Sequence, residues 1–430
     1  MNDLLPLLKT RVPGPKSRGL ARQMCHYESR NITCISDRWP VFWQRAAGAN
    51  VWDVDGNRYI DLTAAFGVAS VGHNNPRVVA ALKTQAGKLI HAMGDVHPNE
   101  LKLKLARELV ELTFERWCNC ASVKRGSVAG AASASPSSPA RVIFANSGAE
   151  AVEAALKTAV MHTKRPGVVA FEGAYHGLTY GALDTTWRAY FRSPFSKQLG
   201  HFTAHVPFGR MPDVANLENF GAVIVEPIQG RGGIIVPPDD FLPKLRRFCD
   251  DHSLLLIFDE IYSGFCRTGR WFACEHWGVT PDVVCVGKAM TSGFPMSACI
   301  GRAEVMDSWP ESNGEAIHTS TFLGNPLGCA AALASISEMK RMKLDKRSQE
   351  LGKWLVARLE KLGKVRGKGL MLGLEAGNAA PLVEKLLQRG VLALPEGDHN
   401  DILGLTPPLV ITKRQLEYCV GELVALVHRS

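Results

Sequence analysis

Short apolar runs alternate with longer segments of helical periodicity through the middle of the chain. The helical segments include residues 147–163 and 239–251. The apolar runs lie at residues 142–144, 168–171, 222–225, 254–258, 283–286 and 297–300. Continuous apolar runs are typical of parallel strands buried on both faces, and the helices between them are typical crossover connections. The pattern therefore predicts an α/β fold with a mostly parallel sheet.

The segments before and after this alternation are less regular. The first ~50 residues indicate an irregular arm, and residues 51–60 predict a hairpin because apolar residues flank an Asp-Gly turn on both sides. Helices are expected over about 76–89 and 99–117. After Asn325 the chain predicts helix, helix, strand, helix, strand and helix, which indicates a second, smaller α/β domain.

These patterns divide the chain into three parts. We expect an N-terminal arm and part of the small domain in residues 1–75, a large domain in 76–325, and a small C-terminal domain in 326–430. Residues 121–140 are rich in Ala and Ser and contain two prolines, with almost no large apolar residues. They predict a flexible surface insertion within the large domain, because the α/β pattern resumes after them without a new start.

Composition excludes several classes of protein. The 430 residues are 46% hydrophobic and 21% charged, which is typical of a globular chain and not of a disordered or fibrous one. The net charge of +9 is a mild, dispersed excess that suits an anionic ligand and does not indicate a nucleic-acid partner. The longest apolar runs fall short of the roughly 18 residues that a membrane span needs, so no membrane association is expected.

The 11 cysteines contain no CxxC pair, so neither a zinc site nor a thioredoxin-like motif is expected, and we predict no metal. Reduced, buried thiols in a cytoplasmic protein are the simpler interpretation. Residues 1–22 are basic enough for a targeting segment, but Asp3 and the early prolines argue against one.

Polar residues follow three of the predicted strands. Ser147 and the small residues after it open a helix, which is either an ordinary N-cap or an anion site suited to a phosphate. Asp259 follows five apolar residues, and is either a solvated loop acid or a buried acid held against a cationic heterocycle nitrogen. Lys288 ends another strand, and is either a surface residue or a desolvated amine that could form a Schiff base.

Ligands of parallel sheets gather at the carboxyl ends of the strands, so these three residues are expected to lie together. A phosphate cradle, a buried acid and a strand-end lysine match the needs of one cofactor, pyridoxal 5'-phosphate (PLP). That cofactor requires an amine for its aldehyde, an acid for its pyridine nitrogen and an anion site for its phosphate. The combination favours the functional interpretation of each residue over the structural one.

With these motifs in their order and spacing, the chain resembles the class III aminotransferases of the fold-type I PLP enzymes. The resemblance runs from about residue 51 to residue 411. The stretches that carry it are WDVDGNRYIDL, NSGAEAVEAALK, FEGAYHG, VIVEPIQG, IFDEIYSGFCRTGR, PDVVCVGKAM, STFLGNPLGCAAA and TPPLVIT.

The resemblance implies a role for each matching residue. Lys288 would bind the cofactor covalently and then carry the proton during transfer, and Asp259 would pair with the pyridine nitrogen. The cofactor phosphate would be bound by Ser147, Gly148 and Ala149.

The resemblance also assigns residues to positions around the cofactor ring. Tyr175 would stack on one face with His176 beside it, and Ile261 would pack on the other face. Tyr262 occupies a position often filled by Gln and could reach the phenolic oxygen of the cofactor, while Glu226 would lie near the substrate.

The resemblance also implies an assembly. Thr321 would reach the phosphate of the neighbouring subunit, which implies a homodimer with shared active sites.

Besides Tyr262, four positions depart from the family pattern. Leu178 and Gly404 stand where many relatives place arginines that hold a substrate carboxylate. Arg231 replaces a Glu in the segment that often reads QGEGG, and Phe66 puts a side chain without a hydroxyl in the pocket. Two usual carboxylate anchors are therefore absent, and the substrate is expected to differ from that of the relatives.

We therefore expect an aminotransferase that moves an amino group from an amine or amino compound to a pyruvate-like keto acid by a ping-pong mechanism. The alternative within the family is an aminomutase or an amino-acid racemase. A non-catalytic binding module is disfavoured because Lys288, Asp259 and Ser147 are all present.

Overall fold

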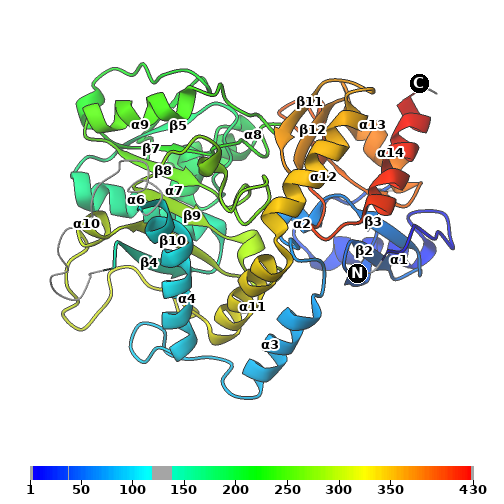
Figure 1. The fold of residues 1–430 in the computed structure, drawn as a ribbon, viewed down its shortest axis with the longest axis horizontal. Coiled ribbons are helices and arrows are strands. Elements are labelled where there is room, and N and C mark those ends of the chain that lie inside the picture. The colour runs from blue at the N-terminus through cyan, green and yellow to red at the C-terminus, as the bar shows by residue number, and fades with distance from the viewer. Residues whose placement is uncertain (1–2, 37, 119–137, 428–430) are drawn as a thin grey trace.

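The computed structural model describes residues 3–36, 38–118 and 138–427. Most of the insertion predicted at 121–140 lies outside these residues. The chain forms a larger lobe around a central sheet and a smaller lobe that combines the C-terminal elements with strands from the N-terminal region (Figure 1). The predicted boundaries at 75/76 and 325/326 remain predictions.

The large lobe is built on a seven-stranded sheet in the order β4-β10-β9-β8-β7-β5-β6. Only β10 runs antiparallel to its neighbours β4 and β9, so the expectation of a mostly parallel sheet is confirmed. One strand of the sheet, β6, was not predicted, because polar Thr203 and His205 interrupt its apolar character. The strands are β4 (Ala140–Ala145), β5 (Gly167–Phe171), β6 (Thr203–Val206), β7 (Phe220–Val225), β8 (Leu255–Asp259), β9 (Val283–Val286) and β10 (Ser297–Arg302).

Both faces of this sheet are covered, which explains the continuous apolar runs. In β8, Leu255 and Ile257 pack into one hydrophobic cluster, while Leu256 and Phe258 pack into another on the opposite face. Side chains alternate across a strand, so a strand buried on both faces must be apolar at every position. The first cluster is closed by α6 (Gly148–Thr163), and the second by α4 (Glu100–Val110) and α9 (Phe241–Asp251).

Shorter helices complete the large lobe. They are α7 (Tyr180–Thr185), α8 (Ala189–Arg192) and α10 (Ala303–Met306). The helix expected over 99–117 corresponds to α4, which continues as a π-helical segment at Glu111–Glu115. The long α11 (Pro326–Met342) packs against α3 (Pro76–Ala86) and leads into the small lobe (Figure 1).

The small lobe contains more strands than predicted after Asn325. Four short strands form an antiparallel sheet in the order β11-β12-β15-β14, and β13 joins a second sheet. Glycines at 367, 373 and 404 interrupt the apolar runs of these strands. Most of the strands were therefore not predicted, because the prediction relied on continuous apolar runs. The elements are α12 (Leu344–Leu359), β11 (Val365–Lys368), β12 (Met371–Glu375), α13 (Ala379–Leu387), β13 (Val391–Leu392), β14 (Leu394–Glu396), β15 (Ile402–Leu405) and α14 (Lys413–Val427).

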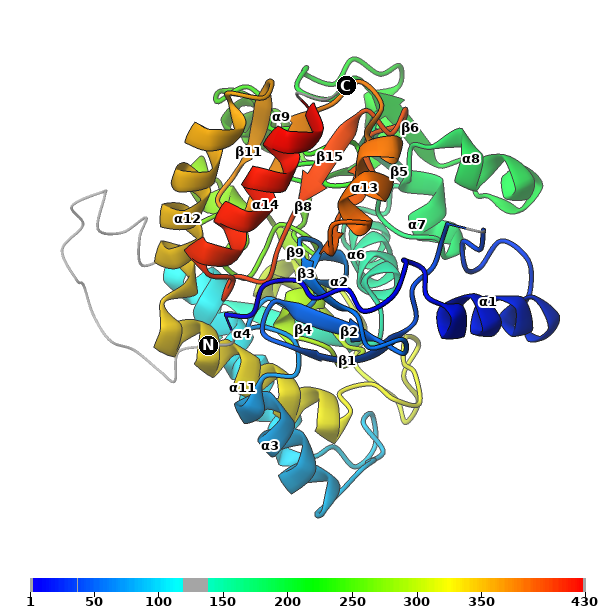
Figure 2. The same ribbon diagram turned by 90° about the vertical axis from the view of Figure 1, so that its right-hand side faces the viewer.

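The N-terminal region joins the C-terminal one through the sheet β1-β2-β3-β13 (Figure 2). The predicted hairpin is confirmed as β2 (Asn50–Asp53) paired antiparallel with β3 (Arg58–Asp61), preceded by β1 (Trp43–Ala47) and followed by α2 (Ala64–Gly67).

The expectation of a wholly irregular arm was wrong, because Pro15–Tyr27 forms helix α1. Asp55 accepts hydrogen bonds from the backbone N–H groups of Lys16 at 2.8 Å and Ser17 at 2.9 Å. This acid caps the helix from a distant loop, which local sequence does not reveal. Among the described residues, no helix is long and apolar enough to cross a membrane.

Candidate functional site

The carboxyl ends of β4, β8 and β9 meet at one edge of the large sheet, beside a cavity of about 300 Å³. Ser147, Asp259 and Lys288 follow or end these three strands, as the sequence pattern predicts. The predicted residues that line the cavity are Gly148, Ala149, Tyr175, His176, Leu178, Glu226, Arg231, Asp259, Ile261, Tyr262 and Lys288.

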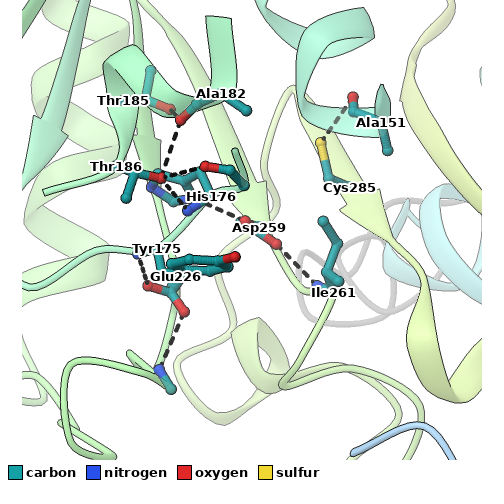
Figure 3. Close-up of polar contacts among 12 residues, drawn as sticks. Ala151, Tyr175, His176, Ala182, Thr185, Thr186, Glu226, Asp259, Ile261 and Cys285 are labelled. Atoms are coloured by element: carbon teal, nitrogen blue, oxygen red, sulfur yellow. Dashed lines mark hydrogen bonds and ion pairs between the residues drawn. The ribbon is translucent and has the colours of Figure 1, made fainter. Parts of the chain in front are cut away.

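Asp259 ends β8 with its side chain almost fully buried, at 5% exposure. Its Oδ2 lies 2.8 Å from Nδ1 of His176, and its Oδ1 accepts a hydrogen bond from the backbone N–H of Ile261 at 3.0 Å (Figure 3). A buried carboxylate needs such donors, because desolvation otherwise disfavours its charge. Asp259 is therefore a fixed acceptor in the cavity wall and not a solvated loop acid.

His176 is held in place behind Asp259. Its backbone N–H donates to Oγ1 of Thr186 at 3.0 Å, and Thr186 donates in turn to the carbonyl oxygen of Gly177 (Figure 3). With Nδ1 donating to the carboxylate, the imidazole is fixed in one orientation. Within the described residues, Nε2 of His176 is buried and has no hydrogen-bond partner.

Lys288 follows β9 and begins the short helix η5 (Lys288–Met290). Its φ of +43° lies in the left-handed region, which is costly for a residue with a Cβ and is typical of functional positions. Burial lowers the pKa of the ammonium, while the nearby charges of Asp259 and Glu226 act in the opposite direction. The Nζ atom lies 5.0 Å from the centroid of the Tyr262 ring. A partly desolvated amine of this kind is suited to attack an aldehyde.

Glu226 follows β7 and lies in the same cavity. It accepts hydrogen bonds from the backbone N–H groups of Tyr175 and Gly230, both at 3.1 Å (Figure 3). Burial nevertheless raises the pKa of its carboxyl to about 7. Glu226 can therefore hold or release a proton near neutral pH.

The start of α6 forms a cradle with free backbone N–H groups. Ser147 caps the helix by accepting a hydrogen bond from the N–H of Glu150 at 3.3 Å. A Cβ added to Gly148 would lie 3.0 Å from Ile261, so the absent side chain lets Ile261 approach the helix end. Gly177 similarly faces Ala149, with an added Cβ only 2.6 Å from the alanine Cβ. The N-terminus of a 16-residue helix favours a phosphate.

Tyr175 and Tyr262 provide aromatic surface in the cavity. The Tyr175 ring packs edge-on against Phe191, with centroids 5.7 Å apart. The Tyr262 hydroxyl lies 3.1 Å from Oγ1 of Thr406, so its hydrogen bond runs to the small lobe. Thr406 begins the stretch TPPLVIT, but it was not predicted as a site residue because that motif does not indicate a contact with residue 262.

Four predicted residues are not among those that line this cavity. Ser147 is the N-cap of α6 and directly precedes the lining residue Gly148. Phe66 lines a larger neighbouring cavity of about 960 Å³, which shares Arg231 with the first one. Thr321 is exposed and does not line the cavity of its own chain. Gly404 is buried in β15, and the space beside it is filled by Glu396. Leu178 lies at the cavity with half of its surface exposed.

Glu396 lies beside the site behind Arg231 and lines neither cavity, and sequence reasoning did not identify it. Its Oε2 lies 3.6 Å from Nε of Arg231, and burial raises the pKa of its carboxyl to about 7. The guanidinium of Arg231 lies 5.8 Å from the Tyr175 ring centroid. The sequence around Glu396 resembles no motif, and only the pairing of β14 with β15 brings it to the site.

Lys288, Asp259 and the α6 cradle line one small cavity and match the groups that PLP requires. The amine can bind the aldehyde, the carboxylate can bind the pyridine nitrogen, and the helix N-terminus can bind the phosphate. The residues that are present therefore fit the cofactor.

Comparison with known proteins supports this interpretation. A model of the family Aminotransferase class-III matches residues 34–427. An acetylornithine aminotransferase of Methanopyrus kandleri is 40% identical over 400 residues, covering 91% of this chain and 96% of the relative. A 4-aminobutyrate aminotransferase of Mycobacterium bovis is 35% identical over 449 residues, covering 94% of each chain.

A solved structure is similar over nearly the whole chain. It is an ornithine aminotransferase from Toxoplasma gondii, described with partial occupancy of PLP at its active site. It shares 30% sequence identity with a TM-score of 0.80, covering 95% of this chain and 93% of the other. The predicted fold type is therefore confirmed.

Proposed function

The chain belongs to the class III aminotransferase family and is a PLP-dependent aminotransferase, and we propose that it moves an amino group from an amine or amino compound to a pyruvate-like keto acid. The transfer is proposed to run as two half-reactions of a ping-pong cycle. The observation that carries the proposal is the position of Lys288, Asp259 and the α6 N-terminus around one cavity.

PLP supplies an aldehyde that combines with amines and a pyridine ring that withdraws electrons from the substrate carbon. In our proposal, Ser147, Gly148 and Ala149 bind its phosphate at the start of α6. Tyr175 stacks on one face of the ring and Ile261 packs on the other. The position of Gly148 next to Ile261 supports this assignment. A side chain at position 148 would contact Ile261 and narrow the space at the start of α6.

Asp259 would accept a hydrogen bond from the pyridine nitrogen and so favour its protonated form. The contact at 2.8 Å with His176 and the contact at 3.0 Å with the Ile261 N–H leave the carboxylate little freedom to turn away. Such preorganisation makes an electrostatic contact effective, since no reorganisation is required during the reaction. Lys288 would hold the cofactor through its amine, and the lowered pKa of that amine would suit it to accept a proton from the substrate carbon.

The lining of the two cavities supports an unusual donor. Leu178 and Gly404 cannot replace a bidentate Arg–carboxylate contact. The larger cavity of about 960 Å³ has space for a bulky body, and Phe66 lies in its wall. Arg231 lines the cavity of Lys288 and is our candidate anchor for the carboxylate of the keto acid. Although the relatives are named for acetylornithine and 4-aminobutyrate, we propose a bulky or polyhydroxylated amine as the donor.

We also propose a homodimer in which Thr321 reaches the cofactor phosphate of the partner subunit. A patch of exposed apolar side chains beside Thr321 supports this, since such patches mark interfaces. His91 contacts Phe322 there, with ring centroids 5.3 Å apart. The patch is formed by Leu89, Ile90, Met93, Val96 and Phe322, each at least 42% exposed. A cytoplasmic location is also proposed, supported by the unpaired thiols of the ten described cysteines.

A donor and acceptor screen on the purified holoenzyme tests the proposal. Primary amines should change the absorption spectrum of the cofactor and release a carbonyl product, and pyruvate should then restore the spectrum. Efficient turnover of 4-aminobutyrate or ornithine, with bulky amines inert, would contradict the proposed donor. An isomerised or racemised product without a separate carbonyl product would instead favour an aminomutase or racemase.

A further inference from the structure

The ring of Tyr262 fits closely between two glycines. A Cβ added to Gly67 would lie 2.5 Å from Cε2 of Tyr262, and one added to Gly230 would lie 2.2 Å from Cδ1. These two ring atoms belong to opposite edges of the ring, so a side chain at either glycine would displace it. Glycine at both positions therefore leaves a slot that the edges of one aromatic ring fill.

The hydroxyl of Tyr262 anchors the far end of the ring. It lies 3.1 Å from Oγ1 of Thr406, and Oγ1 of Thr406 donates to the carbonyl oxygen of Thr63 at 3.3 Å. Because a threonine hydroxyl has one proton to donate, the phenol is the donor in its own contact with Thr406. Burial raises the pKa of the Tyr262 hydroxyl, so the phenol keeps the proton that it donates.

The amine of Lys288 lies over the face of this fixed ring. Its Nζ atom is 5.0 Å from the ring centroid of Tyr262, and both residues line the cavity of about 300 Å³. A cation within about 6 Å of the centroid is attracted by the negative charge density of an aromatic face. The attraction favours the ammonium form of Lys288 over the neutral amine.

Charged groups from several elements act on the same amine. Burial lowers the pKa of Lys288, and the positive charge of Arg231 acts in the same direction. Three carboxylates raise it, those of Asp259, Glu226 and Glu396. In the described part of the chain, none of the three forms an ion pair with Lys288. The aromatic face therefore supplies a direct contact that the carboxylates do not.

We infer that Tyr262 is a positioning residue for Lys288, and that its ring face holds the ammonium group that Lys288 carries during proton transfer. In this arrangement the hydroxyl of Tyr262 anchors the ring to Thr406. The inference rests on the proposed function, because it concerns the amine that accepts the proton in that reaction. The Gln that often fills this position in relatives has no aromatic face, so the contact depends on the departure at Tyr262.

The test measures the protonation of Lys288 by competitive labelling with a trace of acetic anhydride. Only the neutral amine reacts, so the extent of labelling as a function of pH gives the midpoint of the titration. Mass spectrometry of the peptide that contains Lys288 reads the label. The full chain is labelled after removal of the cofactor, so that the amine is free to react.

Three changes at position 262 separate the ring face from the shape of the side chain. Tyr262→Phe keeps the ring in its slot and should leave the midpoint of Lys288 within about 0.3 pH units of the wild type. Trifluorophenylalanine at this position keeps the shape of phenylalanine but removes negative charge from the ring face. It should lower the midpoint by about 0.5 to 1 pH unit relative to Tyr262→Phe. Tyr262→Met has no ring and should lower the midpoint by a similar amount.

Lys368 is the control within the same samples. Its Nζ atom lies 5.4 Å from the centroid of the Trp277 ring, and it lines neither the cavity of Lys288 nor the larger one. Its labelling midpoint should be the same in the wild type and in every variant, which also shows that the variants are folded.

The role in the reaction is measured with the holoenzyme in a single turnover, using the best amine of the donor screen. The change in the cofactor spectrum should be about threefold or more slower with trifluorophenylalanine at position 262 than in Tyr262→Phe. An equal rate in these two proteins would overturn the inference.

Equal midpoints of Lys288 in Tyr262→Phe and in the fluorinated protein would also overturn it, even if Tyr262→Met fails to fold. The labelling uses no substrate, so a failure of the proposed donor would leave these midpoints unchanged. The failure of the inference and that of the proposed function are therefore distinguished.

Discussion

Nδ1 of His176 lies 2.8 Å from Oδ2 of Asp259, and both side chains are almost fully buried. The contact joins the segment after β5 to the end of β8, two parts of the chain that are 83 residues apart. The backbone N–H of His176 also donates to Oγ1 of Thr186 at 3.0 Å, so the imidazole is held in one position behind Asp259. Asp259 is thereby directed into the cavity that Lys288 shares.

Asp259→Asn should preserve the fold and lower kcat by several powers of ten. The amide has nearly the same shape but cannot keep the pyridine nitrogen protonated. Loss of one charge-stabilising contact of this kind typically costs about 3 kcal/mol or more in the transition state. Steady-state kinetics with cofactor-saturated enzyme measures the effect, and near wild-type turnover would show that Asp259 has no such role.

His176→Phe should cause a smaller loss, of roughly tenfold to a hundredfold in kcat. The ring is kept, but Asp259 loses the hydrogen bond that orients it and retains the N–H of Ile261. Combining His176→Phe with Asp259→Asn provides the control. The double variant should be hardly slower than Asp259→Asn alone, because His176 acts through Asp259. Fully additive losses would mean that His176 acts independently.

Thr321→Ala should weaken retention of PLP at the active site of the partner subunit. Mixing inactive Lys288→Ala chains with Thr321→Ala chains tests this directly. In the mixed dimer one site carries both substitutions and the other carries neither, so tight cofactor binding and activity should partly recover. A mixture no more active than the average of its two parents would rule out shared sites.

The stability of the protein should depend on pH through Glu396. Burial raises the pKa of this carboxyl to about 7, above its ordinary value of 4.5, although the positive charges of Arg231, Arg188 and Lys288 oppose the shift. Between these two values the unfolded chain is ionised while the folded one keeps its proton, so raising the pH favours unfolding. The contribution is complete below about pH 4.5 and is lost as the pH rises through about 7, with an upper bound of roughly 3 kcal/mol.

Glu396→Gln removes this titration without changing the size of the side chain. The thermal midpoint of the wild type should therefore fall relative to that of Glu396→Gln as the pH rises from about 5 to about 8. Glu375→Gln, at a half-exposed position on β12, is the control and should follow the wild type. Parallel pH profiles for wild type and Glu396→Gln would show that the folded carboxyl titrates normally.

The central features of the fold could be predicted because they are local in sequence. A strand buried on both faces must be apolar throughout, so the strands before Ser147, Asp259 and Lys288 were visible as short apolar runs. A polar residue at the end of such a run has to lie at the edge of the sheet. The topology of the sheet was therefore enough to predict that the three groups lie close together. The cavity at that edge agrees with this prediction.

Features that depend on distant contacts could not be predicted in this way. Helix α1 has a mostly polar sequence, and its cap is Asp55 from another loop. The local sequence therefore did not indicate a helix. Glu396 reaches the site only through the register of β14 on β15, and that register follows from short strands interrupted by glycine. The lack of a side chain at Gly404 was visible in the sequence, but the residue that fills the space beside it was not.

Reduction of the holoenzyme with borohydride tests the central claim most directly, because it fixes the cofactor on the amine that holds it. After proteolysis, mass spectrometry should find the reduced cofactor on the peptide that contains Lys288. Lys288→Ala should take up no reducible label and should show no turnover with any amine. Label on a different lysine, or turnover by Lys288→Ala, would contradict the account of this site.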